Sequence, residues 1–424
     1  MKYFKTDGIR GKAYSEVTLS LAYLIGMFFA SSDKSVVIGI DTRESSPELA
    51  NAIYNGVKKN KQTKYAGVIP TPGLMYYSLT HNCIGIMVTA SHNLYKDNGI
   101  KVFEDGKKIS KETIKQIESF IDKNADIVYK GEYLEDLKID EKIISEYKKF
   151  IENKITKESQ NVIFDGANGA FSYLLKELFD NKNLINCDPN GKNINLDCGT
   201  NQVSNLINQV KNRKLDYGFA FDGDGDRVCV VDKFNRIYEG DFLTFVFAKF
   251  LFDNNQLVSN TVVFTEVVNP GILERVEELG MYYIIVEIGD QNIYTALENG
   301  YLIGGEASGH IINKTVLPFG DGLVNALELL KILHIGNKKL HEYSNGIKMH
   351  CCKKHNLLIN PKDFNLSKRA KFILDSFIKR KKLSLIIRKS GTENLVRLFL
   401  YQEKSNGLNN NLNKIVRIIT NDRR

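Results

Sequence analysis

Three aspartates that alternate with glycines form the segment of this sequence best suited to chemistry. Asp222, Asp224 and Asp226 directly follow an apolar run with strand character, Phe219 to Phe221. Alternate residues of an extended chain point the same way, so the three carboxylates are expected to converge on one point. A hard divalent cation with oxygen ligands, above all Mg²⁺, would relieve their mutual repulsion. A solvated acidic turn rarely holds three aspartates in register, so the pattern predicts a metal site.

A serine lies at the end of a second apolar run. Ser91 follows the run from Ile84 to Val88, and His92 comes next. Active groups of α/β proteins lie at the carboxyl ends of strands, but a polar turn that caps a helix explains this segment equally well. Ser91 is not part of a Gly-x-Ser-x-Gly elbow, which argues against a hydrolase. A phosphate on Ser91 would place negative charge beside the predicted Mg²⁺ and unite the two motifs.

A loop near the C-terminus carries groups that suit an anion. Arg388, Ser390 and Thr392 supply a guanidinium and two hydroxyls. Gly391 lets backbone N–H groups face a bound phosphate. The spacing differs from that of a nucleotide P-loop. A charged hairpin loop has similar residues, so the prediction of a phosphate site depends on the other motifs.

Two further glycine-rich loops carry polar side chains. Glu306, Ser308 and His310 occupy alternate positions after an apolar strand and offer donors and acceptors to the hydroxyls of a sugar. Arg10 lies on a glycine-flanked loop near the N-terminus, where a fixed cation would serve a reacting phosphoryl group or form an ion-paired turn. A lone histidine is more often structural, but the clustering of these residues favours a functional role.

Three strand-then-helix units must position these loops. Apolar runs begin at Val36, Asn161 and Thr261, and each ends in a polar turn before a stretch with helical spacing. Such units are typical of strands buried on both faces of a parallel sheet. We expect an α/β fold with three similar α/β domains, mainly parallel mixed sheets, and a smaller C-terminal α+β domain. The expected domains are residues 1–152, 153–255, 256–345 and 346–424.

Composition places the chain among ordinary globular proteins. Its 424 residues are 43% hydrophobic and 25% charged, which excludes a disordered or fibrous protein and predicts several domains. The net charge of +8 comes without a dense basic block, so we expect attraction of small anions rather than nucleic-acid binding. Six cysteines without a Cys-x-x-Cys pair suggest a cytoplasmic protein. The apolar stretch 17–30 is too short to span a membrane, and we expect a buried helix and no membrane partner.

Nine motifs, in this order, resemble those of the α-D-phosphohexomutase superfamily, and most closely its bacterial glucosamine-phosphate branch. Each motif alone is a weak match, but nine in order are very specific, and they extend from residue 6 to nearly the end of the chain. They are Thr-Asp-Gly-Ile-Arg-Gly (6–11), Asp-Thr-Arg (41–43), Pro-Thr-Pro-Gly (70–73), Thr-Ala-Ser-His-Asn (89–93), Asp-Asn-Gly-Ile-Lys (97–101), Asp-Gly-Asp-Gly-Asp-Arg (222–227), Gly-Glu-Ala-Ser-Gly-His (305–310), Gly-Asp-Gly-Leu (320–323) and Arg-Lys-Ser-Gly-Thr-Glu (388–393).

The resemblance implies a role for each motif in one cleft between four domains. Ser91 would be a phosphoserine that holds Mg²⁺ together with Asp222, Asp224 and Asp226. The residues implied in proton transfer or charge stabilisation, among which the base stays open, are Arg10, Lys101 and His310. The residues implied in substrate binding are Arg227, Glu306, Ser308, Arg388, Ser390, Gly391 and Thr392.

The resemblance also implies a reaction. The expected activity is interconversion of glucosamine 6-phosphate and glucosamine 1-phosphate by an intramolecular phosphotransferase, with glucosamine 1,6-bisphosphate as intermediate and activator. The product would supply UDP-N-acetylglucosamine for peptidoglycan synthesis. A monomer or a homodimer is expected, with a sugar phosphate as the only partner.

Several positions depart from the usual family pattern. Leu94 and Asn394 replace prolines, Gln291 replaces an arginine, and Phe319 replaces a threonine. Because proline fixes φ, the first two changes suggest softer loops. The alternatives are a phosphomannomutase/phosphoglucomutase, which prefers a neutral sugar, and a non-catalytic protein that binds Mg²⁺ and sugar phosphates.

Overall fold

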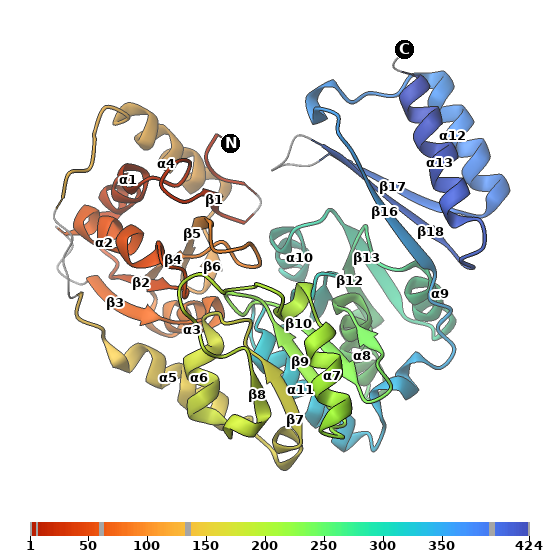
Figure 1. Ribbon diagram of the computed structural model, residues 1–424, viewed down its shortest axis with the longest axis horizontal. Helices are drawn as coiled ribbons and strands as arrows, with labels where there is room; N and C mark the ends of the chain where they lie inside the picture. The colour runs from red at the N-terminus through yellow and green to blue at the C-terminus, as the bar shows by residue number, and fades with distance from the viewer. Residues whose placement is uncertain (1, 6, 59–62, 132–136, 390–394, 423–424) are drawn as a thin grey trace.

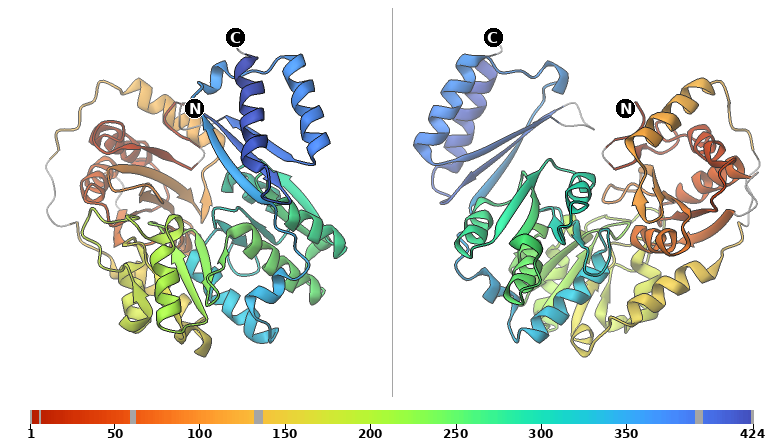
Figure 2. Two further views of the ribbon diagram at one scale, coloured as in Figure 1. Left: turned by 45° about the vertical axis from the view of Figure 1, so that its right-hand side comes forward. Right: turned by 180° about the vertical axis from the view of Figure 1, so that it is seen from behind.

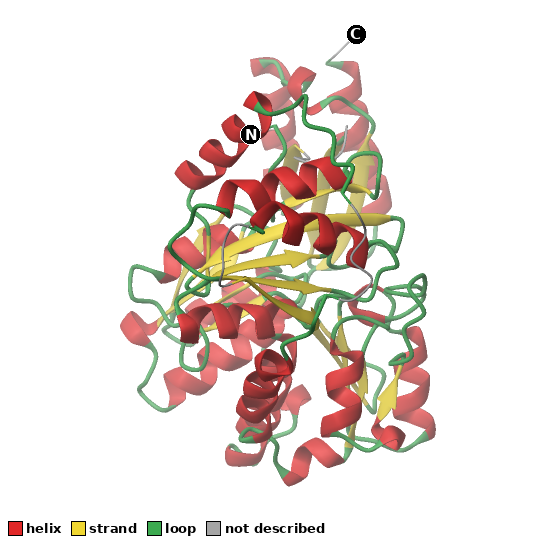
Figure 3. Ribbon diagram, turned by 90° about the vertical axis from the view of Figure 1, so that its left-hand side faces the viewer, coloured by secondary structure: helices red, strands yellow, loops and turns green. Residues whose placement is uncertain are grey.

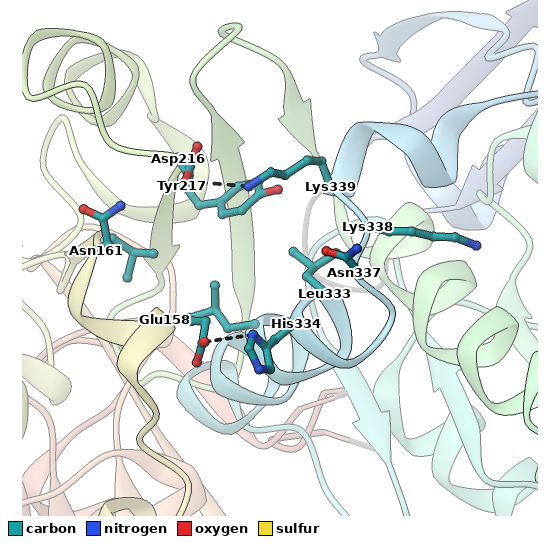
Figure 4. Close-up of a pocket in the computed structure, with 11 residues that line it drawn as sticks. Glu158, Asn161, Asp216, Tyr217, Leu333, His334, Asn337, Lys338 and Lys339 are labelled. Carbon is teal, nitrogen blue, oxygen red and sulfur yellow. Dashed lines mark ion pairs between the residues drawn. The ribbon is translucent and has the colours of Figure 1, made fainter.

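Four β-sheets follow one another along the chain in the computed structural model of the protein (Figure 1). The structure describes residues 2–5, 7–58, 63–131, 137–389 and 395–422. The first three sheets are mixed, and the fourth is antiparallel. Figure 3 shows the strands lying between layers of helices. The expected fold class, three α/β domains and a smaller α+β domain, is confirmed.

The first sheet has the strand order β1-β5-β4-β2-β3, with β6 beside β5. All residues of β2 and β4 are buried, as predicted for strands covered on both faces. Helices α1, α2 and α4 cover one face, and α3 and α5 cover the other. The strands are β1 (Ile9–Lys12), β2 (Val36–Ile40), β3 (Thr63–Val68), β4 (Ile84–Val88), β5 (Asp97–Glu104) and β6 (Lys107–Lys108). The helices are α1 (Leu19–Phe29), α2 (Ser46–Val57), α3 (Thr71–His81), α4 (Lys111–Lys123) and α5 (Glu141–Glu152).

The second sheet has the order β11-β10-β9-β7-β8. Its central strand β9 runs parallel to β7 and antiparallel to β10, so β9 and β10 form a hairpin whose loop is the aspartate segment 222–227. The strands are β7 (Val162–Asp165), β8 (Leu184–Ile185), β9 (Tyr217–Phe221), β10 (Val228–Asp232) and β11 (Ile237–Tyr238). The helices are α6 (Phe171–Leu178) and α7 (Ser204–Asn212).

The third sheet has the order β13-β12-β14-β15, and α11 packs against strands of both the second and the third sheet. Helices α8 and α11 are buried along most of their length and pack in one hydrophobic core that continues through the first three domains. The strands are β12 (Thr261–Thr265), β13 (Tyr282–Val286), β14 (Ile303–Gly305) and β15 (Ile311–Asn313). The helices are α8 (Gly240–Asp253), α9 (Pro270–Glu278), α10 (Asp290–Leu297) and α11 (Gly322–Ile335).

The C-terminal sheet has a core of its own. Helices α12 and α13 pack against one face of the sheet, around Leu374, Leu398 and Ile415, and lie on the outside of the molecule (Figures 1 and 2). The side-chain amide of Asn269 donates to the carbonyl of His350 and accepts from its N–H, and these two hydrogen bonds join this domain to the third. Its elements are β16 (Cys351–Leu357), β17 (Ser384–Lys389), β18 (Val396–Gln402), α12 (Lys368–Lys381) and α13 (Leu408–Asn421).

Short 3₁₀ turns and one apolar helix complete the description. The apolar stretch 17–30 forms α1, which is largely buried as expected. Within the described ranges of the chain, no helix is both long and apolar enough to cross a bilayer. The 3₁₀ turns are η1 (Lys157–Gln160), η2 (Asn181–Asn183), η3 (Gly199–Asn201), η4 (Val258–Asn260), η5 (Leu340–Ser344) and η6 (Pro361–Asp363).

Candidate active site

The three aspartates of the 222–227 loop form a buried cluster of oxygen donors. One carboxylate oxygen from each of Asp222, Asp224 and Asp226 lies within 4.8 Å of the others. Oδ1 of Asp224 and Oδ1 of Asp226 are buried and have no hydrogen-bond partner. Burial, together with the carboxylates of Asp226 and Asp224, raises the pKa of Asp222 to about 8. Crowded anionic oxygens with unused lone pairs fit a hard divalent cation such as Mg²⁺.

The aspartates converge through a turn and not through the strand alternation assumed from the sequence. The segment lies between the last pair of the hairpin, Phe221 and Val228, and Gly225 adopts φ +81°. A residue with a Cβ is strained in that conformation, which explains the glycine. The predicted convergence therefore has a different physical origin, because the loop curls around the point that the three carboxylates share.

The aspartate loop also joins the first three domains. The backbone N–H of Thr71, at the start of α3, donates to the carbonyl of Asp224 over 2.9 Å. The N–H of Gly322, at the start of α11, donates to the carbonyl of Gly225 over 2.9 Å. The loop belongs to the second domain, so these bonds fix it to the first and third domains at once.

Ser91 meets this cluster from the first domain. It is fully buried, has φ +51°, and donates a hydrogen bond from Oγ to Oδ2 of Asp222 over 2.7 Å. The hydroxyl of Thr89 accepts a hydrogen bond from the N–H of Ser91 over 2.9 Å. A left-handed backbone is strained for serine, and such strain persists where surrounding contacts enforce it. The structure thus brings the predicted nucleophile and the predicted metal ligands together.

The side chain of Arg43 holds the serine loop in place. It is fully buried, and Nε pairs with Asp41 over 2.8 Å. Its two terminal nitrogens donate to four carbonyls of the loop, those of Ser91, Asn93, Leu94 and Asp97. The carbonyl of Leu94, which stands where the family usually has proline, accepts one of these bonds.

Lys101, on β5, lies among carboxylates from two domains. Its ammonium is 2.8 Å from Asp224, 3.0 Å from Asp226 and 2.9 Å from Asp7. Burial alone would lower the pKa of Lys101, but these three anions outweigh it and raise the pKa well above its ordinary value. Arg10 pairs with Asp7 over 2.5 Å. Lys101 therefore contacts the carboxylate cluster directly, and Arg10 is linked to it through Asp7, the anion that the two cations share.

His310, on the third domain, is also a cation of this cluster. Its Nδ1 lies 3.7 Å from Asp226 and its Nε2 lies 3.6 Å from Asp290. Burial opposes protonation, but Asp290 and Asp226 outweigh it and raise the pKa of His310 to about 9. Asp290 also pairs with Lys108 of the first domain over 2.5 Å. An ion-pair chain thus links the first and third domains beside His310.

Arg227 and His92 complete the surroundings of the serine. Arg227 has its Nε 3.8 Å from Asp222 and 3.7 Å from Asp226. The charge of Arg227, followed by burial and the charge of Arg10, lowers the pKa of His92 to about 2. The ring of His92 is therefore neutral, and its Nδ1 lies 3.3 Å from Oγ of Ser91. The aspartate cluster and the serine are consequently surrounded by cations, which suits a phosphate group.

The predicted sugar loop is formed but internally paired. Oε2 of Glu306 accepts a hydrogen bond from the hydroxyl of Ser308 over 2.8 Å, and Oε1 accepts from the N–H of Gly289 over 2.7 Å. Glu306 is buried, and its negative charge helps to raise the pKa of Arg227. A ligand hydroxyl would have to compete for these bonds or add to them. The loop therefore lies close to the charged cluster, with its carboxylate already oriented.

The predicted phosphate loop lies on the C-terminal domain. Arg388 is half-buried on β17, opposite Arg397 on β18. Burial and the charge of Arg397 lower the pKa of Arg388, while Glu266 and Glu306 of the third domain oppose this. The fourth domain thus presents a pair of guanidiniums toward the third. Ser390, Gly391, Thr392 and Asn394 lie outside the described residues.

Sequence reasoning named several of these motifs without finding the residues that support them. Asp7, Lys108 and Asp290 form the ion-pair chain, and His92 lies beside Ser91. Asp7 stands in a motif in which only Arg10 was singled out, and Asp290 precedes the unusual Gln291. Lys108 stands in a lysine-rich stretch, and nothing in the sequence distinguishes it from its neighbours.

Comparisons with known proteins bear on the whole chain. Models of the phosphoglucomutase/phosphomannomutase α/β/α domains I, II and III match residues 1–127, 140–235 and 239–349. The phosphoglucosamine mutases of Ruminiclostridium cellulolyticum and Clostridium tetani are each 34% identical, over 99% of this chain and 98% of theirs.

Solved structures share the fold. A phosphoglucomutase/phosphomannomutase family protein from Burkholderia thailandensis superposes with a TM-score of 0.77 at 22% identity, over 99% of this chain and 97% of that chain. The N-acetylphosphoglucosamine mutase of Aspergillus fumigatus, in complex with GlcNAc-6P and magnesium, superposes with a TM-score of 0.67 at 16% identity, over 99% of this chain and 96% of that chain.

Proposed function

The chain belongs to the phosphoglucomutase/phosphomannomutase family, and from this premise we propose that it is a phosphoglucosamine mutase. It interconverts glucosamine 6-phosphate and glucosamine 1-phosphate as an intramolecular phosphotransferase. The observation that carries the proposal is the hydrogen bond of 2.7 Å from Oγ of Ser91 to Asp222, inside the buried carboxylate cluster. The relatives at 34% identity over nearly the full chain support the choice of amino sugar.

Asp222, Asp224 and Asp226 would hold Mg²⁺ together with the phosphate carried by Ser91. When bound, the ion neutralises part of the negative charge on the transferring phosphoryl group. The free lone pairs of Asp224 and Asp226 support this assignment, because buried carboxylate oxygens without a partner are costly. The protein's own residues supply the rest of the positive charge.

In the first half-reaction, the bond from phosphorus to Oγ of phosphorylated Ser91 breaks, and a bond to the free hydroxyl oxygen of the sugar monophosphate forms. The proton of that hydroxyl ends on Oγ of Ser91, which then donates it to Asp222 in a hydrogen bond, as in the structure. Lys101 and His310, both protonated, stabilise the charge of the phosphoryl group as it moves between the two oxygens.

The second half-reaction repeats the first with the other end of the sugar. The bisphosphate turns over, presents its second phosphate to Ser91, and leaves as the isomeric monophosphate. The Arg388 loop, with Ser390, Gly391 and Thr392, holds the phosphate that is not transferred, while Glu306 and Ser308 bind sugar hydroxyls. The pairing of Arg388 with Arg397 across β17 and β18 supports an anion site on the fourth domain.

We further propose a cytoplasmic location and a sugar phosphate as the sole small-molecule partner, with glucosamine 1,6-bisphosphate as activator. All six cysteines are free thiols, and Cys83, Cys187, Cys198 and Cys229 are buried, which supports a reducing compartment. The product would serve synthesis of UDP-N-acetylglucosamine.

A coupled assay tests the proposal. Purified protein is given glucosamine 6-phosphate, Mg²⁺ and a trace of glucosamine 1,6-bisphosphate, and its intact mass is measured for one added phosphate. We expect turnover, and a higher kcat/KM than with glucose or mannose phosphates. Preference for a neutral sugar would make the protein a phosphomannomutase/phosphoglucomutase. A folded, phosphorylated protein without turnover on any of these sugars would overturn the mutase assignment.

A further inference from the structure

Charge is distributed very unevenly between the C-terminal domain and the rest of the chain. Residues 346–424 hold 19 Lys and Arg against 5 Asp and Glu, whereas residues 1–345 hold 39 against 45. The chain's net positive charge therefore comes entirely from its last domain. Holding one phosphate requires a few cations, so this excess needs another explanation.

Most of the excess lies away from the proposed active site. The strands β16–β18 have one face toward the sugar loop and one toward α12 and α13, since Leu398 packs in the helical core while its neighbour Arg397 lies opposite Arg388. The basic residues of the helices thus lie on the side of the sheet that cannot reach the substrate. The two helices form the outer surface of this domain (Figure 2).

An open groove of about 590 Å³ runs between α12 and α13. Its apolar side chains include Phe372, Ile373 and Ile418, and Phe372 is 72% exposed. Its basic side chains are Arg380, Lys414 and Arg417, and no acidic residue lines it. We call these six residues the α12–α13 face. In the described part of the chain, no carboxylate forms an ion pair with Arg380, Lys414 or Arg417.

The spacing along α12 concentrates these groups on one stripe. Arg369, Phe372 with its neighbour Ile373, Ser376 and Arg380 follow one another at intervals of three or four residues, and all five are exposed. An exposed phenylalanine and isoleucine between basic residues are typical of helices that lie in the interface of a membrane. Exposed apolar groups in such a contiguous arrangement mark an interaction site.

From these observations we propose that the α12–α13 face binds an anionic lipid surface. Lipid phosphates would pair with Arg380, Lys414 and Arg417, while Phe372 and Ile373 enter the boundary of the acyl chains. A nucleic acid offers phosphates but no aliphatic partner for Ile373. Such a contact lies on the membrane surface and therefore needs no membrane-spanning segment. It does not depend on the proposed reaction.

Binding to vesicles tests the proposal. The full-length protein is sedimented with vesicles of phosphatidylglycerol and phosphatidylcholine in equal parts, and with vesicles of phosphatidylcholine alone. We expect binding to the anionic vesicles only, weakened by high salt. Replacing Arg380, Lys414 and Arg417 by Glu should lower the partition coefficient by roughly a hundredfold, because each basic residue near an anionic membrane contributes about 1 kcal/mol. The matched control replaces the exposed Lys115, Lys123 and Lys142 by Glu and should bind as the wild type does.

A fluorescent reporter tests insertion. The chain has no tryptophan, so Phe372→Trp introduces its only indole. We expect its emission to shift to shorter wavelength with anionic vesicles and to stay unchanged with phosphatidylcholine. All variants should keep the wild-type mutase activity in solution, which shows that they are folded. Three results would each overturn the proposal. The first is no binding of the wild type to vesicles, and the second is an equal loss of binding in the control variant with three substitutions. The third is binding of an oligoribonucleotide without binding to vesicles.

Discussion

The two halves of the proposed site are built in opposite ways. Around Ser91, three domains share one hydrophobic core, and the fully buried Arg43–Asp41 ion pair fixes the serine loop. Around Arg388, a separately packed domain presents a half-buried arginine, and hydrogen bonds of Asn269 with His350 and of Tyr401 with Val267 join this domain to the third. Phosphoryl transfer needs fixed charges, whereas an intermediate that exchanges its ends needs a partner domain that can adjust. The contrast assigns chemistry to the first half and substrate holding to the second.

The strongest test of the rigid half is removal of its nucleophile. Ser91→Ala should reduce turnover to background, because the transferable phosphate has no other oxygen to occupy at this point. The buried hydroxyl donates one hydrogen bond to Asp222 and lies 3.3 Å from Nδ1 of His92, so few contacts are lost and the fold should persist. Turnover and intact mass are measured together, with the circular dichroism spectrum as control. Substantial remaining turnover would contradict the phosphoserine assignment.

Removal of a proposed metal ligand should have the next largest effect. Asp224→Asn should lower kcat by about a hundredfold or more, a loss typical of deleting one preorganised electrostatic group in an active site. Activity is titrated against Mg²⁺ and after chelation, and the variant should require more Mg²⁺ than the wild type. Asp188→Asn is the matched control, since its side chain is 91% exposed. An unchanged Mg²⁺ requirement in the Asp224 variant would exclude the loop as the metal site.

Arg43→Ala tests how the rigid half is held. The change leaves Asp41 buried without its partner and frees four carbonyls of the serine loop. Removing one partner of a buried ion pair costs about 3–5 kcal/mol. We therefore expect a loss of this order in the free energy of unfolding, measured with urea. A loss no larger than that of an exposed arginine, such as Arg213→Ala, would show that the clamp is dispensable.

Arg388→Ala tests the adjustable half. A hydrogen bond to a charged group is worth about 1.5–3 kcal/mol, which corresponds to a loss in kcat/KM of roughly ten- to a hundredfold. The effect should lie mainly in KM, because Arg388 is proposed to hold the phosphate that does not react. Arg388→Lys should recover part of it. A fall in kcat alone, with KM unchanged, would place Arg388 in the chemistry and remove the contrast between the halves.

The smallest effect concerns a pH-dependent link inside the rigid half. Asp321 caps α11, accepts a hydrogen bond from Tyr147 of α5 over 2.7 Å, and has its pKa raised by burial to about 6. The folded state then binds more protons than the unfolded state between the ordinary pKa of 3.8 and about 6, so this group lowers stability as pH rises through that window. In Asp321→Asn, the amide oxygen can still accept from the N–H of Val324, the amide NH₂ can donate to the hydroxyl oxygen of Tyr147, and the side chain no longer titrates. Its stability relative to wild type should rise over this window, and parallel pH profiles would contradict the assignment.

Sequence reasoning found the groups that carry chemistry more readily than the groups that position them. The aspartate, serine and Glu306 motifs are local, so their spacing alone predicts what they can do. The carbonyl clamp of Arg43 and the chain Lys108–Asp290–His310 join residues far apart in sequence, and only the tertiary structure shows them. Strand positions were predictable from apolar runs, but the antiparallel partners β5 and β10 were not. Whether two strands pair in parallel or antiparallel depends on the path of the connecting loops. The amino-acid composition of the strands does not reveal that path.

The aspartate loop has a consequence for biosynthesis of the protein. Its backbone is bonded to the first and third domains through Thr71 and Gly322 as well as to its own. A nascent chain therefore cannot form the full set of backbone bonds around this carboxylate cluster until its third domain has been made and has docked. Chains truncated before that point would be inactive however well their first domains fold, so the cluster serves as an internal check that assembly has finished.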